Sequence, residues 1–150
     1  MQINRTVLAF IFMAWSAAAV AADGLITLKS RYGAVETMDR LEQQVRQRGL
    51  TVFARIDHAT GAAKAGKTLR PTTLLVFGNP QGGTPFMQCE QTVGIDLPLR
   101  ALVWEDAFGQ VWLGYNDPAY IARRHSVSNC PVVKKLVTVL YDITKETVAD

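Results

Sequence analysis

Asp57 and His58 are the adjacent residues best suited to acid-base chemistry. An imidazole exchanges protons near neutral pH, and a neighbouring carboxylate can fix its tautomer. The pair follows the apolar segment 50–56, at the expected end of a strand. Adjacent residues of an extended chain point to opposite faces, however, so the two side chains need not touch. A solvated or helix-capping histidine in a loop is the alternative interpretation.

Cys89 and Cys130 are the two cysteines of the chain. In an oxidising compartment they could form a disulfide, which would stabilise the fold by about 4 kcal/mol in the chain-entropy model. Two small buried apolar side chains are the other interpretation, and the sequence leaves both open. With His58, His125 and Met87 these cysteines match no compact ligand motif, so we predict no metal and no other cofactor.

The segment 61–68 matches the phosphate-binding pattern G-x4-G-K-[ST] letter for letter. That pattern binds phosphate only where the loop opens a helix. Pro71 and a predicted strand follow too closely to leave room for one, so nucleotide binding is not expected. The sequence also carries no G-x-S-x-G, H-E-x-x-H or C-x-x-C motif, and therefore no recognisable nucleophile or zinc site.

Two further groups of side chains have structural interpretations. Arg123, Arg124 and His125 form a small basic cluster, which would complement the dipole at a helix carboxyl end. Trp104 and Trp112 fall on facing strands of a predicted hairpin, as core or interface aromatics.

Residues 1–22 have the pattern of a secretory signal peptide. Arg5 precedes an apolar run, and small residues follow up to a cleavage site near Ala22. Removing this leader leaves 15 basic against 13 acidic residues, a net charge of +2, which suggests no nucleic-acid partner. We expect a single domain over residues 23–150, with a core at 25–126, in the periplasm or outside the cell and not in the membrane.

The first half of the chain predicts strands and helices from apolar spacing. Segment 24–31 alternates as a strand, and Ala34, Met38, Leu41 and Val45 recur at helical spacing before Gly49. Segments 50–56 and 72–77 predict two more strands. The intervening segment 57–67 predicts a loop with one helical turn.

The second half predicts a helix within 81–93, then a hairpin and two helices. Segments 99–105 and 111–115 form the hairpin, with Gly109 in its turn. Asp117 would cap a short helix reaching Arg124. The tail 132–148 has helical spacing, although its β-branched residues keep a strand over 137–143 as an alternative.

Three segments resemble the DUF302 domain family. They are RPTTLLVFGNPQGGTPFMQ (70–88), IDLPLRALVWEDAFGQVWLGYNDPAYIARRH (95–125) and the earlier ARIDHATGA (54–62). The resemblance implies an α+β fold like that of the TATA-binding protein, and a homodimer. Together with the element order it predicts a mainly antiparallel sheet of about five strands with helices packed on one face, in the order β-α-β-β-α-β-β-α plus a C-terminal helix.

The resemblance also implies which polar residues could line a shared groove. By their positions in the family-like segments these are Asp57, His58, Asn79, Gln88, Asp96, Tyr115 and Asn116. Our leading hypothesis is a non-catalytic periplasmic module that binds a small ligand or a partner where strand ends carry Asp57, His58 and Asn79. One alternative is a small enzyme with His58 as acid or base and Asn79 or Tyr115 as its polar partner. The other is a structural homodimer assembled through the hairpin face.

Overall fold

The structure, a computed structural model, describes residues 23–149, and the predicted signal peptide lies outside them. Its strands are β1 (Leu25–Lys29), β2 (Thr51–Asp57), β3 (Thr72–Gly78), β4 (Leu99–Glu105) and β5 (Val111–Asn116). Its helices are α1 (Ala34–Gln47), α2 (His58–Lys64), α3 (Pro80–Cys89), the 3-10 helix η1 (Gln91–Ile95), α4 (Pro118–Arg124) and α5 (Val132–Val148). Over this part of the chain, no helix has the length and apolar character needed to cross a bilayer.

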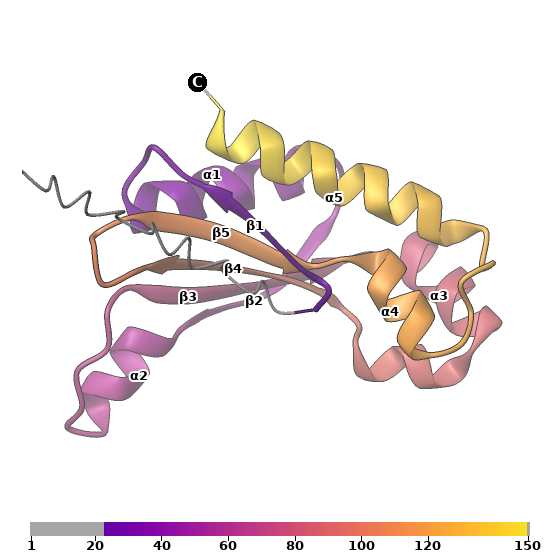
Figure 1. Ribbon diagram of the computed structural model, residues 1–150, viewed down its shortest axis with the longest axis horizontal. Coiled ribbons are helices and arrows are strands. Elements are labelled where there is room, and N and C mark those ends of the chain that lie inside the picture. The colour runs from indigo at the N-terminus through magenta and orange to yellow at the C-terminus, as the bar shows by residue number, and fades with distance from the viewer. Residues whose placement is uncertain (1–22, 150) are drawn as a thin grey trace, which may run out of the picture.

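The five strands form one sheet in the order β1-β5-β4-β3-β2, and every neighbouring pair is antiparallel. Figure 1 shows α1 and α5 together on one side of this sheet, with α3 and α4 beyond one end and α2 beyond the other. The predicted antiparallel α+β fold with helices on one face is therefore confirmed.

Strand alternation supplies the core between the sheet and the helices. Register places Leu28, Leu113 and Val103 in one row across three strands. The adjacent row on the same face contains Tyr115, Ala101 and Leu75. Met38, Leu41 and Val45 of α1 are buried against them, as the helical spacing predicted. The α5 residues Leu136, Leu140 and Ile143 complete the core, so the tail is a helix and the strand alternative is wrong.

The opposite face of the sheet carries a second apolar surface. Register places Ile56, Leu74, Leu102, Trp104 and Trp112 on this open face, away from α1 and α5. The two indoles stack with ring centroids 6.4 Å apart. Trp104 also lies over the backbone of β5, where a Cβ on Gly114 would come within 2.9 Å of the indole. Glycine at 114 therefore makes room for this aromatic pair.

The β4–β5 turn is organised by one carboxylate. Asp106 accepts hydrogen bonds from the backbone amides of Phe108 and Gln110 and from Nε1 of Trp112, at 2.8, 3.0 and 2.9 Å. The indole donor, followed by the two amides, lowers the pKa of Asp106. Gly109 has a φ of 78°, the left-handed conformation predicted for this hairpin.

Two elements differ from the predicted pattern. Segment 58–64 is a complete seven-residue helix, because the Asp57 carboxylate caps it by accepting from the backbone amide of Thr60. The helix predicted within 81–93 is divided into α3 and η1 at Glu90, whose extended backbone ends α3 and whose carboxylate caps η1. The predicted cap of α4 by Asp117 is present, at 2.9 Å from the amide of Ala119.

Candidate functional site

Asp57 and His58 lie at the junction of β2 with α2, exposed to solvent. The Asp57 carboxylate binds the amide and the hydroxyl of Thr60 at 2.9 and 2.7 Å, and these hydrogen bonds lower its pKa. The carboxylate is therefore occupied in capping α2. Within residues 23–149 the His58 side chain makes no hydrogen bond or ion pair, so it corresponds to the solvated histidine of the alternative interpretation.

Asn79 lies at the opposite end of the same strand pair. In the antiparallel register Asp57 pairs with Thr73, whereas Gly78, which precedes Asn79, pairs with Thr51. Six residues of strand separate the two ends, about 20 Å. The prediction of a single groove containing Asp57, His58 and Asn79 is therefore wrong. In an antiparallel pair the carboxyl ends of the two strands lie at opposite ends of the pair.

The other predicted groove residues are also dispersed. Gln88 is exposed on α3, and Asn116 is exposed at the last position of β5. Tyr115 is buried in the core, and this burial raises the pKa of its phenol, although the Thr144 hydroxyl offsets part of the effect. Alternation with the apolar residues Val111 and Leu113 was the sequence signal that could have placed Tyr115 on the core face.

A cavity of about 730 Å³, partly open to solvent, lies at the Asn79 end. It is formed between α3, α5, the start of β2 and the loop that leads into β4. Most of the side chains that line it are apolar: Leu50, Phe53, Pro80, Met87, Leu97, Pro98, Leu99, Val132, Leu136 and Val139. The volume falls in the range of about 300–1,000 Å³ that is usual for small-molecule sites.

The amino-terminal turn of α3 forms one wall of the cavity. The Asn79 side chain caps this helix by accepting from the amide of Gly82 at 2.9 Å. Gly82 and Gly83 follow, and both line the cavity. A Cβ on Gly82 would lie 3.2 Å from Leu136 of α5, whereas one on Gly83 would make ordinary contacts of 3.7 Å or more. Glycine at 82 thus allows α3 to approach α5 closely.

The facing wall is a single stripe of α5. Val132, Lys135, Leu136 and Val139 recur at the three- and four-residue spacing of one helix face. Arg48, at the carboxyl end of α1, is the second cation of the lining. Its guanidinium is paired with the Glu146 carboxylate at 2.7 Å and also binds Gln44.

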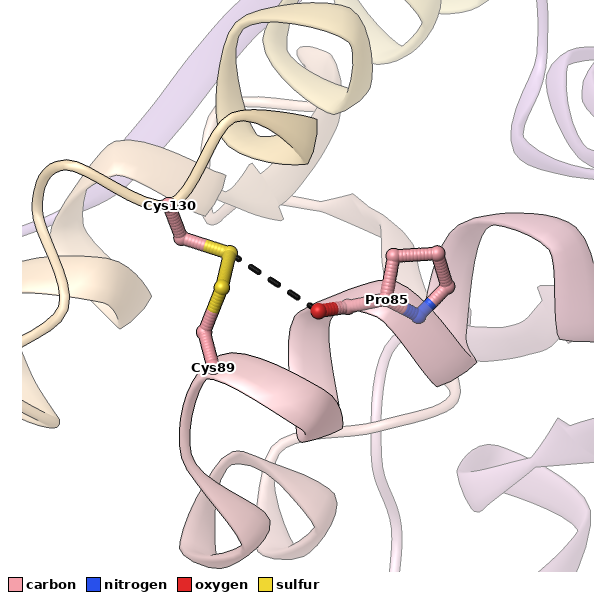
Figure 2. The surroundings of a disulfide bond; sticks show 3 residues. All are labelled: Pro85, Cys89 and Cys130. Carbon is pink, nitrogen blue, oxygen red and sulfur yellow. Dashed lines mark hydrogen bonds between the residues drawn. A yellow bond between two sulfur atoms is a disulfide. The ribbon is translucent and has the colours of Figure 1, made fainter.

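A disulfide between Cys89 and Cys130 ties the two walls together (Figure 2). Cys89 is the last residue of α3, and Cys130 lies two positions before α5. The sulfur of Cys130 also lies 3.8 Å from the carbonyl oxygen of Pro85, within α3. Of the two interpretations left open by the sequence, the structure has the disulfide. It fixes the approach of α5 to the helix that carries Asn79.

Asp96 forms a polar cluster with residues that the sequence did not connect to it. Its carboxylate lies 2.7 Å from His125 Nε2 and accepts from Arg124 at 3.1 Å. The Asp96 and His125 side chains are only 11% and 9% exposed. Because 29 positions separate them, no local pattern could have predicted this pair. It holds the segment before Leu97 and Pro98, two residues of the cavity wall, against the end of α4.

The cluster continues through Thr92 to Glu90. The Thr92 hydroxyl lies 2.9 Å from His125 Nδ1 and 3.1 Å from the Glu90 carboxylate. The Thr92 amide and hydroxyl, and then His125, lower the pKa of Glu90. These contacts tie η1 to the end of α4, next to the cavity wall.

The remaining sequence motifs have structural roles. Phosphate binding requires that the loop lead into the start of a helix. The phosphate-loop pattern at 61–68 instead coincides with the end of α2. No group of three or more metal-ligating side chains converges anywhere in the described part of the chain.

The strand order and helix placement define an α+β domain built on one open antiparallel sheet. The sequence matches the family described as domain of unknown function DUF302 over residues 26–143, and the chain belongs to that family. The resemblance found in the sequence is thereby confirmed. A crystal structure of an uncharacterized conserved DUF302 protein from Bacillus stearothermophilus has a TM-score of 0.75, with 84% of this chain and 99% of that chain covered. At 20% identity this likeness shows the fold alone.

Similar curated proteins come from Brucella. One from Brucella suis biovar 1, named fluoride-specific ion channel FluC 1, is 46% identical over 135 residues, which are 89% of this chain and 53% of that protein. A protein of the same name from Brucella abortus biovar 1 is also 46% identical, with 50% of its length covered. The chain therefore spans about half the length of these relatives. The name belongs to each relative as a whole protein.

Proposed function

We propose that this protein is a non-catalytic binding module and that the cavity between α3 and α5 holds a small ligand. One observation carries the proposal: a cavity of about 730 Å³ that is lined mostly by apolar side chains and by a few polar ones. That combination is the usual form of a small-molecule site, in which apolar contact supplies affinity and polar groups supply orientation. In this proposal Asn79 lines the site, whereas Asp57 and His58 lie outside it.

A periplasmic or extracellular location remains part of this proposal. The disulfide supports it, because such bonds persist in oxidising compartments and are rare in the cytosol. The signal-peptide pattern of residues 1–22 supports it independently.

The test is a titration of the purified protein with 1-anilinonaphthalene, a neutral apolar dye whose fluorescence rises in apolar surroundings. We expect saturable binding to the wild type and its loss in Gly83→Leu, because the new side chain would project into the cavity from a position where its Cβ fits. Gly61→Leu is the matched control, since Gly61 is also a helical glycine but has open space around it.

Two results would contradict the proposal. The first is the absence of saturable dye binding to the wild type. The second is equal binding by wild type and Gly83→Leu when both show the same circular dichroism and melting temperature. If Gly83→Leu failed to fold, Val139→Phe, from the facing wall, would replace it in the same comparison.

The enzyme alternative has less support. A general acid or base needs a reacting group and a positioned neighbour within hydrogen-bond distance. His58 stands on an exposed helix start, about 20 Å along the strand pair from Asn79. Tyr115, the other polar residue in that hypothesis, is buried in the core. The ligand-binding hypothesis is therefore preferred.

A homodimer is a second candidate, favoured by the open face of the sheet. Ile56 is 42% exposed there, beside the half-buried Leu74, Leu102 and two stacked tryptophans. In sedimentation velocity we expect a dimer for the wild type and a monomer for Ile56→Lys. Val35→Lys, an exposed apolar position on α1, should leave the dimer intact. A monomeric wild type at micromolar concentration would exclude this candidate.

A further inference from the structure

We infer that the ligand is an amphipathic monoanion, with an apolar body between α3 and α5 and its negative group at Lys135. The inference rests on the proposed function and specifies the chemical class of that ligand. The inference is argued from Lys135, Leu136 and the residues that face them across the cavity.

The charge of the lining selects the sign. The cavity is lined by two cationic side chains, Arg48 and Lys135, and by no acidic residue. Arg48 is already neutralised by Glu146, which lies outside the lining, at 2.7 Å. Lys135 is exposed at the rim and, among residues 23–149, has no carboxylate within ion-pair distance. A bound anion would therefore supply the charge that Lys135 lacks.

The helix ends reinforce this sign. Five consecutive residues at the start of α3, from Pro80 to Thr84, line the cavity, so the positive end of that helix dipole faces the same space. The dipole alone would define no site. It adds to a cavity whose uncompensated side-chain charge is already positive.

The walls select an apolar body. Val132, Leu136 and Val139 extend over about two turns of α5, and Met87 and Leu97 face them from the other side. Burying apolar surface stabilises a complex by about 25 cal/mol per Å², so a small hydrophilic anion would leave most of this contact unused. An inorganic anion is thus a poorer match than a molecule with a hydrocarbon or aromatic body.

The experiment compares two dyes with one body. The first is neutral 1-anilinonaphthalene, and the second is 8-anilinonaphthalene-1-sulfonate, which adds a single sulfonate. Both are titrated against the full protein as wild type, Lys135→Gln and Lys134→Gln. Lys134 is the matched control because it is an exposed lysine on the same helix that does not line the cavity.

We expect the sulfonate to bind the wild type more tightly than the neutral dye. Lys135→Gln should weaken the sulfonate by about fivefold, the scale of a partly screened surface charge, and leave the neutral dye within about twofold. Lys134→Gln should change neither. As a second readout, decanoate should displace the neutral dye at lower concentration than decyltrimethylammonium, which has the opposite charge and an alkyl chain one carbon longer.

The outcomes separate the inference from the proposed function. Equal affinity for the two dyes, equal effects of the two lysine variants, or equal displacement by decanoate and decyltrimethylammonium would overturn the anionic assignment, while the cavity would remain a ligand site. The absence of saturable binding by either dye would overturn the proposed function, and the inference would fall with it.

Discussion

The two ends of the β2–β3 strand pair have the same local construction and different surroundings. At one end Asp57 is the last residue of β2 and caps α2, and at the other Asn79 follows β3 and caps α3. None of the α2 residues is buried. In α3, by contrast, Phe86 is fully buried, and a disulfide joins the helix to the segment that precedes α5. Only the Asn79 end carries the cavity.

A polar residue at a strand end is therefore not enough to define a site. The cap fixes a local helix, but a cavity needs a second wall, and here that wall is α5, about 50 residues further along the chain. The two ends should therefore respond differently to the same kind of change.

Removing the disulfide should have the largest effect. We expect Cys89→Ala with Cys130→Ala to lower the free energy of unfolding by about 4 kcal/mol, because the bond closes a loop with a sequence separation of 41. Urea denaturation measures the change. The rate of amide exchange should increase more in α3 than in α2. A loss below about 1 kcal/mol would indicate that packing alone holds α3 to α5.

Removing a helix cap should lower the free energy of unfolding by less than removing the disulfide, and by different amounts at the two ends. Asn79→Ala should lower the free energy of unfolding by about 1 kcal/mol, because the amide of Gly82 in α3 loses its side-chain acceptor. Asp57→Ala should fray α2 with a smaller global effect, because α2 buries no side chain. Equal changes in the urea midpoint would contradict the comparison.

The two caps should also differ in pH dependence. The hydrogen bonds from Thr60 lower the pKa of Asp57 in the folded state, so their stabilisation of α2 is fully present above the ordinary value of 3.8 and is lost as the pH falls through the folded value. The neutral Asn79 cap does not titrate. Amide exchange in acid should therefore lose protection at Thr60 before Gly82, and equal loss would count against this assignment.

His58→Ala should have the smallest effect. The side chain is exposed and unbonded, so we expect a change in the free energy of unfolding within about 0.5 kcal/mol and unchanged binding of 1-anilinonaphthalene. A loss of dye binding in this variant would restore His58 to the site.

Much of the fold could be predicted because apolar spacing reports directly on burial. The positions that predicted α1, including Met38 and Leu41, are the ones buried in the core, and the turn at Gly109 has the expected backbone. The α2 helix was underestimated because Gly61 lowers helix propensity, whereas the Asp57 cap raises it. Such opposing local effects differ by only about 1 kcal/mol.

The site was less predictable because it depends on contacts between distant segments. Asn79 could be chosen from its position, but nothing local distinguishes it from Asp57. The pairing of Asp96 with His125 needs the η1 turn and the end of α4 to meet, and Lys135 becomes a cavity residue only when α5 packs beside α3. Composition and periodicity contain none of these distances.

The strand order leaves β1 and β2 with unpaired backbone along the two margins of the sheet. An exposed edge strand can pair with a strand of another chain, and such pairing leads to aggregation. Here β1 is only five residues long and presents Lys29, whereas β2 is interrupted by a bulge between Val52 and Ala54 and carries Arg55. Short length, irregular backbone and charge all disfavour such extension, so the protein should resist fibril formation even at high concentration.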